Sequence, residues 1–214
     1  MKLIDLLYPK RCPLCGEVTS EKIGCHPLCE KCNIKQKENR INYSGDGFFC
    51  VYKYNGKLRD AVLKYKYEGE IWLAEPFAYM IINYIEQNYG FDSFDILAFV
   101  PVNDKRLSTR GYDQVYEIAK IISKKKKIRV EKFLKKKENY GDNAVDRKDR
   151  RQRISEDKYY FAGDKNLIYN KRVLLLDDIV TTGATLRDCK ALLIENGARN
   201  VCTAVIASGR KDLW

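Results

Sequence analysis

Three observations predict an α/β fold, with a parallel sheet flanked by helices and a small amino-terminal module. Short apolar runs with the length of buried strands alternate with segments whose apolar residues recur at helical spacing. Strands and helices that alternate in this way build a doubly wound parallel sheet. The first part of the chain instead carries paired cysteines, and 214 residues suffice for one such domain with a small appendage. We therefore expect a cysteine-containing module over residues 1–45 and the sheet domain over residues 46–214.

Two cysteine pairs near the amino terminus have the spacing of a zinc site. Their pattern is C-x2-C-x13-C-x2-C, formed by Cys12, Cys15, Cys29 and Cys32. Zinc takes four tetrahedral ligands, and each C-x2-C turn directs two thiolates toward one point. Redox chemistry is the competing explanation of a CxxC pair, but two pairs this close together favour zinc. Four thiolates leave no open coordination position, so the metal is expected to be structural. Cys25 and His26 lie between the pairs as alternative ligands.

The first half of the sheet domain begins after a polar linker at about residues 34–47. Alternating apolar and aromatic residues predict a strand over Phe48–Tyr54, which ends at an Asn55-Gly56 turn. The apolar spacing then predicts, in order, helices over Lys57–Tyr67 and Trp72–Gln87, a buried strand over Ile96–Val100, a helix over Asp113–Ser123 and a short strand over Ile128–Val130.

The second half of the domain starts with a highly charged stretch. Residues from about Lys135 to Lys158 show no sustained apolar period, and a loop of this length in a compact domain is usually functional or disordered. A buried strand is expected over Val173–Leu176, then a helix that reaches Asn196 and is capped by Gly197. The last buried strand is predicted over Val201–Ala207.

The segment VLLLDDIVTTGAT, at Val173–Thr185, predicts a site for a phosphorylated sugar. Asp177 and Asp178 would lie at the carboxyl end of a strand, where open α/β sheets bind ligands. Two carboxylates can accept hydrogen bonds from a vicinal diol, and the amides at the start of the following helix favour a phosphate. The simpler explanation, that a strand-end Asp only caps a helix, remains open. The dinucleotide and P-loop glycine patterns are absent from this segment.

This segment resembles the PRPP-binding motif of type I phosphoribosyltransferases. Pro101-Val102 and the RGYDQ run at Arg110–Gln114 are similar to the signature of the ComF family of competence proteins, as are the cysteine pairs. A Leu-Lys-Tyr helix end, either Leu63-Lys64-Tyr65 or its repeat Lys66-Tyr67-x-Gly69, also occurs in that family's order. The resemblance implies a type I phosphoribosyltransferase-like domain over residues 46–214, a small zinc module and a role in DNA uptake during natural transformation. One departure is in the stretch Asn143–Arg153, where Arg153 takes the place of the family's Asn.

The resemblance implies a PRPP site with named residues. Asp177 and Asp178 would be the catalytic pair, and the full PRPP-binding set would be Asp177, Asp178, Ile179, Val180, Thr181, Thr182, Gly183, Ala184 and Thr185. The loop after Pro101 leaves a strand at the same sheet edge, so pyrophosphate is expected to bind Val102, Asn103, Lys105, Arg106 and Arg110. Magnesium would bind with PRPP, largely through oxygens of the substrate.

The net charge of +11 arises in one part of the chain. Lys105–Arg153 contains 18 Lys and Arg residues against seven Asp and Glu residues, an excess that equals the whole net charge. Such a segment suits a polyanion, although a solvated lysine-rich surface is the competing explanation. With tyrosines nearby for stacking, we expect single-stranded DNA to bind Lys124, Lys125, Lys126, Lys135, Lys136, Arg147, Arg150 and Arg151.

Taken together, these patterns predict a PRPP-binding, phosphoribosyltransferase-like protein of DNA uptake. The start of the chain is not a convincing signal peptide and no apolar run is long enough for a membrane span, so we expect a cytoplasmic protein without membrane insertion. A competence helicase or the uptake machinery is the expected protein partner. The alternatives are a metabolic phosphoribosyltransferase that acts on a base or another small acceptor, and a scaffold whose sugar-phosphate site is vestigial. Whether the chain turns over a substrate stays open.

Overall fold

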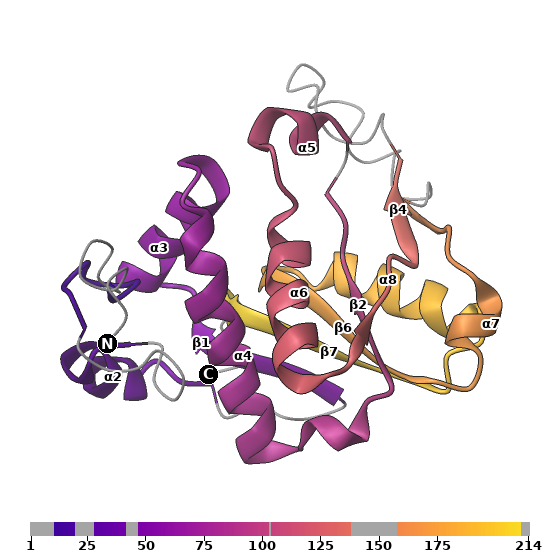
Figure 1. Ribbon diagram of the computed structural model, residues 1–214, viewed down its shortest axis with the longest axis horizontal. Coiled ribbons are helices and arrows are strands. Elements are labelled where there is room, and N and C mark those ends of the chain that lie inside the picture. The colour runs from indigo at the N-terminus through magenta and orange to yellow at the C-terminus, as the bar shows by residue number, and fades with distance from the viewer. Residues whose placement is uncertain (1–10, 20–27, 42–46, 103, 138–157, 211–214) are drawn as a thin grey trace.

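The computed structural model describes residues 11–19, 28–41, 47–102, 104–137 and 158–210. Its elements appear in Figure 1. In chain order they are α2 (Glu30–Lys37), β1 (Phe48–Lys53), α3 (Gly56–Tyr67), η2 (Ile71–Leu73), α4 (Ala74–Asn88), η3 (Phe91–Ser93), β2 (Ile96–Phe99), α5 (Asp104–Arg110), α6 (Gln114–Lys126), β3 (Arg129–Val130), β4 (Leu134–Lys136), β5 (Tyr159–Phe161), α7 (Lys165–Ile168), β6 (Arg172–Val180), α8 (Ala184–Glu195) and β7 (Asn200–Ser208).

Five parallel strands form the main sheet in the order β1-β7-β6-β2-β3. The chain passes from β2 to β3 on one side and then returns to place β6 on the other side of β2. A reversal of this kind is a topological switch point, where open α/β sheets form their ligand crevice. The strands β4 and β5 pair separately as an antiparallel ribbon. The predicted α/β fold with a parallel sheet is therefore confirmed.

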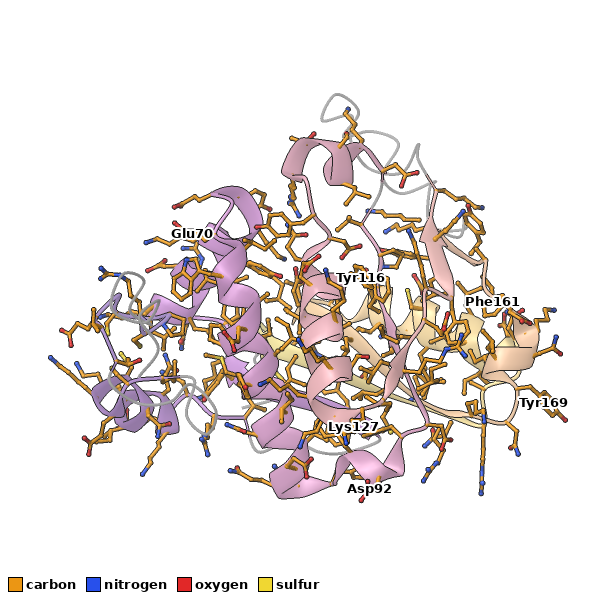
Figure 2. All side chains as sticks on the ribbon, viewed as in Figure 1. Glu70, Asp92, Tyr116, Lys127, Phe161 and Tyr169 are labelled. Carbon is orange, nitrogen blue, oxygen red and sulfur yellow. The ribbon has the colours of Figure 1, made fainter. Side chains whose placement is uncertain are left out.

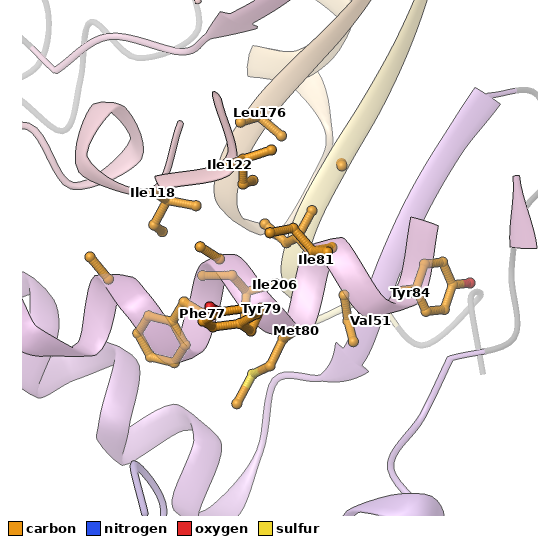
Figure 3. Close-up of a cluster of buried hydrophobic side chains, with 14 of the residues drawn as sticks. Val51, Phe77, Tyr79, Met80, Ile81, Tyr84, Ile118, Ile122, Leu176 and Ile206 are labelled. Carbon is orange, nitrogen blue, oxygen red and sulfur yellow. The ribbon is translucent and has the colours of Figure 1, made fainter. Parts of the chain in front are cut away.

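Two apolar clusters bury the two faces of the sheet. Helices α3, α4 and α6 pack on one face, and α8 packs on the other (Figure 1). Successive side chains of β6 alternate between them, because Leu174 and Leu176 join the first cluster whereas Val173 and Leu175 join the second. Figure 3 shows Ile118 and Ile122 of α6 in the first cluster, near Leu176. The near-continuous apolar runs in the sequence reflect this burial on both faces.

Helix α6 has well-defined ends. The carboxylate of Asp113 caps it by accepting hydrogen bonds from the backbone N–H groups of Val115 and Tyr116, each at 3.1 Å. At the other end, Lys127 adopts a left-handed conformation with a φ of 54°. Figure 2 shows Tyr116 and Lys127 toward opposite ends of this helix. The helix therefore connects the two edges of the sheet along one face.

Several predicted elements required correction. The segment Trp72–Gln87 begins with the short 3-10 turn η2, and the α-helix starts only at Ala74. The charged stretch Lys135–Lys158 contributes its ends to the β4–β5 ribbon, and its residues 138–157 lie outside the described part of the chain. The helices α2, α5 and α7 were not predicted.

The strand predicted over Val173–Leu176 is longer than expected, since β6 runs over Arg172–Val180. Asp177 and Asp178 consequently lie within this strand rather than after it. Leu176 is the last residue of β6 in register with β2, but the register with β7 continues to Val180 and Ser208. Beyond Leu176, β6 therefore has a sheet partner on one side only.

The amino-terminal part packs against the rest of the chain. Leu14, Leu28 and Cys32 are buried and belong to the same apolar cluster as α3 and α4. The division into domains 1–45 and 46–214 stays a prediction. Among the described helices, none combines the length and the apolar character needed to cross a bilayer.

Candidate functional site

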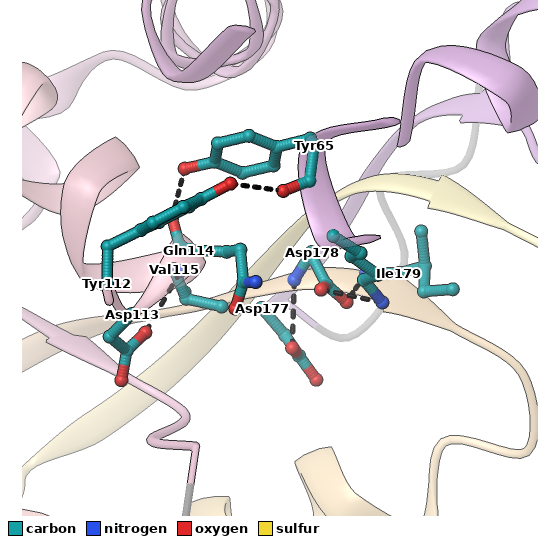
Figure 4. A network of polar contacts seen from close by, with 9 residues as sticks. Tyr65, Tyr112, Asp113, Gln114, Val115, Asp177, Asp178 and Ile179 are labelled. Carbon is teal, nitrogen blue, oxygen red and sulfur yellow. Dashed lines mark hydrogen bonds and ion pairs between the residues drawn. The ribbon is translucent and has the colours of Figure 1, made fainter. Parts of the chain in front are cut away.

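The carboxylates of Asp177 and Asp178 lie at the end of β6 that pairs with β7 alone. The Asp178 Oδ2 atom forms an ion pair with the Lys66 Nζ atom of α3 at 2.7 Å, and both side chains are largely buried. The backbone N–H of Asp178 donates to Asp177 Oδ1 at 2.8 Å, and that of Ile179 donates to Asp178 Oδ1 at 2.6 Å (Figure 4). Within a strand, neighbouring side chains point to opposite faces, but both carboxylates line one pocket of about 230 Å³.

The surroundings of Asp177 favour its protonated form. Burial raises the pKa of Asp177 well above its ordinary value, and the negative charge of Asp178 raises it further. The hydrogen bond from the Asp178 backbone and the charge of Lys66 act in the opposite direction, but burial dominates. The site thus holds one carboxylate neutralised by a lysine and a second that favours its protonated form.

A loop suited to phosphate follows β6. Residues 181–183 form a turn, and α8 begins at Ala184 after Gly183, whose φ of 76° is left-handed. The capping residue, Gly183, has no side chain to satisfy the amides, and the first turn of the helix has no acidic residue. The backbone N–H of Ala184 donates to Thr182 Oγ1 at 3.3 Å. Unpaired amides at the start of a helix favour an anion, so the predicted turn into a helix has the required form.

The side chains of the other residues predicted to bind PRPP lie in different surroundings. Thr185 lines the 230 Å³ pocket with the two carboxylates. Val180 is buried in the cluster beneath α8, and Ile179 packs against the opposite cluster. The strand residues Ile179 and Val180 therefore contribute apolar packing beside the carboxylates.

A larger pocket of about 530 Å³ adjoins the first. Positively charged and aromatic side chains dominate its lining, which is formed by Lys66, Tyr67, Glu68, Gly69, Lys105, Thr109, Arg110 and Tyr112. The two pockets share Lys66, Tyr67 and Arg110. The Arg110 guanidinium carbon lies 5.0 Å from the centre of the Tyr67 ring, a cation–π distance that holds both side chains.

The residues predicted to bind pyrophosphate gather around these pockets. Lys105 and Arg110 line the larger one and Val102 lines the smaller one. Arg106 belongs to the same helix, α5, and Asn103 lies outside the described residues. The structure therefore brings three of the five predicted residues to adjoining pockets.

The RGYDQ segment fixes the geometry of this corner. Besides capping α6, Asp113 accepts a hydrogen bond from the backbone N–H of Val102 at 3.2 Å. The Tyr112 hydroxyl donates to the Tyr65 carbonyl, and the Tyr65 hydroxyl donates to the Gln114 carbonyl at 2.7 Å (Figure 4). These bonds join the end of α3, the loop after β2 and the start of α6. Asp113 and Tyr112 thus act as a structural frame around the site.

Those residues predicted to bind DNA that the structure describes lie on two different elements, α6 and β4. Lys124, Lys125 and Lys126 lie at the far end of α6, where Lys126 pairs with Glu86. Lys135 and Lys136 lie on β4, and Lys136 lines the pocket that contains Asp177 and Asp178. The remaining three, Arg147, Arg150 and Arg151, lie outside the described residues.

The four predicted zinc ligands converge. The sulfur atoms of Cys12, Cys15, Cys29 and Cys32 all lie within 4.8 Å of one another. Cys15 Sγ and Cys29 Sγ are 3.7 Å apart, close to the separation of about 3.8 Å that a tetrahedron with zinc–sulfur bonds of about 2.3 Å requires. This cluster could therefore hold a metal ion, and its thiolates fit structural zinc. Cys25 and His26 lie outside the described residues.

Several residues at the site were missed by reasoning from composition and spacing. Lys66 and Tyr67 line both pockets, and Tyr159 of β5 lines the smaller one. Only the family's Leu-Lys-Tyr motif pointed toward the first two, as one of two possible matches in the chain and without giving either residue a role. Tyr159 belongs to a ribbon whose second strand follows a long charged stretch, and no local pattern marked it.

Comparisons with known proteins agree with this geometry. The sequence profile described as "Phosphoribosyl transferase domain" matches residues 109–213. The chain is 26% identical over 194 residues to competence protein ComFC of Streptococcus pneumoniae, covering 91% of this chain and 79% of that protein. It is 26% identical over 197 residues to competence protein F of Haemophilus influenzae, covering 90% of this chain and 83% of that protein.

The chain is therefore similar to ComF-family competence proteins over about nine tenths of its length, which agrees with the resemblance drawn from its motifs, and its second half matches a phosphoribosyl transferase domain. Among solved structures, the allosteric regulatory enzyme of purine biosynthesis aligns with a TM-score of 0.44 at 18% identity. That alignment covers 67% of this chain and 29% of the enzyme.

The raised pKa of Asp177 predicts that the free energy of unfolding depends on pH. The folded state binds this proton more tightly than the unfolded state, so stability should fall as pH rises from the ordinary value of 3.8 toward the folded-state pKa. Asp177→Asn removes this titration, and the variant should be at least as stable as the parent at neutral pH. Thermal unfolding at several pH values between about 4 and 8 measures the difference.

Asp178→Asn is the matched control, because it leaves the Lys66 ammonium without its carboxylate and should lower stability. Parallel stability curves for the parent and Asp177→Asn across this pH range would contradict the raised pKa.

The cysteine cluster predicts that Cys12→Ser releases zinc. Loss of one of four thiolates weakens a closed structural site, and the amino-terminal module should unfold while the sugar-phosphate site stays mostly intact. Metal content by mass spectrometry should fall from one zinc per chain in the parent. Cys189→Ala, a change at a buried cysteine outside the cluster, should keep the metal. Equal zinc content in the parent and Cys12→Ser would exclude this set of ligands.

Proposed function

We propose that this chain binds PRPP with magnesium at the corner between β2 and β6, and that it acts in DNA uptake during natural transformation. One observation carries the proposal. The carboxylates of Asp177 and Asp178 lie in a pocket that adjoins both a phosphate-type loop and a second pocket lined by cations. Each part of PRPP, the diol, the 5-phosphate and the pyrophosphate, thus has a chemically matched neighbour. A helicase or another uptake protein as the partner stays a prediction.

Each part of PRPP is assigned to a different group of residues. Asp177 and Asp178 accept the ribose hydroxyls, and the backbone of Thr181–Thr185 binds the 5-phosphate. Lys105 and Arg110 face the pyrophosphate from the larger pocket. Magnesium, held largely by pyrophosphate oxygens, supplies positive charge against the leaving group.

Lys66 connects the two halves of this site. Its ammonium is paired with Asp178, and its side chain also lines the cation-rich pocket. When a ribose hydroxyl donates to Asp178, the lysine can turn toward the pyrophosphate without leaving the shared wall of the two pockets. Lys66 would then have an anionic partner in the pyrophosphate, while Asp178 would keep a hydrogen-bond donor in the ribose hydroxyl.

Calorimetric titration with PRPP and magnesium tests the site. The parent should bind, and Asp177→Asn/Asp178→Asn should bind roughly a hundredfold more weakly, because each lost charged hydrogen bond weakens binding by about tenfold or more. Asp188→Asn, which removes an exposed carboxylate from α8, should bind as the parent does. Undiminished binding by the double variant would exclude this pair as the diol site.

A metabolic phosphoribosyltransferase is the second candidate. Tyr67 favours it, because its ring is 70% exposed and lines the 530 Å³ pocket, where a base could stack. Release of pyrophosphate from PRPP when nucleobases are added would support catalysis. Binding of PRPP without any release would favour a role in which PRPP acts as a ligand alone.

The proposed binding of single-stranded DNA rests on α6. Tyr116, Lys120 and Lys124 recur every four residues and are all exposed, so they form a stripe along one side of the helix. Lys120 Nζ lies 5.2 Å from the centre of the Tyr116 ring, which combines a cation with a stacking face. Such combinations bind single strands with little sequence preference. The stripe extends the basic end of α6, Lys124 and Lys125, toward the sugar-phosphate site.

Fluorescence anisotropy with a labelled DNA oligonucleotide over a range of salt concentrations measures this binding. Affinity should fall as salt rises, and Lys124→Ala/Lys125→Ala should reduce the slope of log K against log salt by about 1.4, since each lost phosphate contact contributes about 0.7. Lys165→Ala/Lys171→Ala removes two exposed lysines outside the basic segment and should leave the slope unchanged. A parent slope near zero would contradict DNA binding.

A further inference from the structure

Arg210 occupies a defined position after the last strand of the sheet. The backbone N–H of Gly209 donates to the Val180 carbonyl at 2.9 Å, which fixes this segment to the end of β6. The backbone N–H of Arg210 donates to Ser208 Oγ at 3.0 Å, and Ser208 is fully buried. The residue therefore leaves β7 directly beside the turn that precedes α8.

The side chain of Arg210 reaches over this turn. Its Nη1 atom lies 3.3 Å from the position that a Cβ atom on Gly183 would occupy. Gly183 suits this position because its φ of 76° is left-handed, and a Cβ atom there would crowd the guanidinium so that it would have to shift slightly. The chain brings a cation close to a helix start that already carries partial positive charge.

An anion bound at the start of α8 would lie between the positive end of this helix and the guanidinium. The first turn of α8 has no acidic residue, and its capping residue is the glycine beneath the guanidinium. An anion bound to the amides of α8 would also be within the reach of Arg210. A guanidinium offers paired donors that match two oxygens of a phosphate, which a backbone turn alone does not provide.

We propose that Arg210 is a direct ligand of the sugar 5-phosphate and closes the phosphate site from the side of β7. The inference rests on the proposed PRPP site and extends its phosphate-binding residues beyond Thr181–Thr185. It assigns Arg210 the selection of phosphorylated over unphosphorylated sugars. Pyrophosphate binds elsewhere, at the pockets lined by Lys105 and Arg110, so the two phosphate-binding regions have separate cations.

Separate titrations with ribose 5-phosphate and with magnesium pyrophosphate test this assignment. Arg210→Ala should weaken ribose 5-phosphate by about tenfold or more, because a charged hydrogen bond is lost, and should leave pyrophosphate within about twofold of the parent. Arg210→Lys should bind ribose 5-phosphate with intermediate affinity, since a lysine keeps the charge without the paired donors. Arg199→Ala, at the opposite end of β7, is the control of equal charge and should match the parent for both ligands.

Two results would overturn the assignment while leaving the PRPP site in place. One is parental affinity of Arg210→Ala for ribose 5-phosphate, and the other is an equal loss for both ligands. Failure of the parent to bind either ligand would instead overturn the proposed function together with the inference. Thermal unfolding of each variant confirms that the compared chains are folded.

Discussion

The site depends on the fact that β6 is longer than its neighbour β2. Pairing with β2 ends at Leu176, whose carbonyl accepts the last hydrogen bond of this ladder from the backbone N–H of Val100 at 2.9 Å, and Pro101 follows directly. The chain turns away there, and Asp113 holds the turned segment through the backbone of Val102. The end of β6 is therefore supported by β7 on one side and open on the other. The carboxylates, the phosphate loop and both pockets all lie around this open corner.

Electrostatics at the corner are arranged before any ligand binds. Asp178 already has a cation in Lys66, whereas Asp177 responds to burial and to its charged neighbour with a raised pKa. Two ionised carboxylates in adjacent strand positions would repel each other, and this combination of pairing and protonation reduces that repulsion. The proposed ligand replaces these internal compensations with its own hydroxyls and cation. On this proposal, the ligand would replace the partners that the two carboxylates have in the free protein.

Elements that depend on local interactions could be predicted from the sequence, whereas contacts between distant parts of the chain could not. Strands and helices with strong apolar periodicity, such as β7 and α6, were predicted because burial on a sheet imposes that periodicity locally. The extension of β6 was missed because two aspartates in sequence resemble a strand end, and only the pairing with β7 carries the strand through them. Helix α5 lacks an apolar stripe. The contact of Lys66 with Asp178, 112 residues away along the chain, has no local signal.

Helix α6 joins two parts of the molecule for which different functions are proposed. One end is tied through Asp113 to the loop beside the pocket that contains Asp177 and Asp178, and the other end carries the lysines proposed to bind DNA. Ile118 and Ile122 are buried along its length, so the helix is packed against the sheet. The helix therefore fixes the distance between its basic end and the pocket. If both proposals hold, a bound DNA strand and a ligand in the pocket would sit at the two ends of one continuous hydrogen-bonded element.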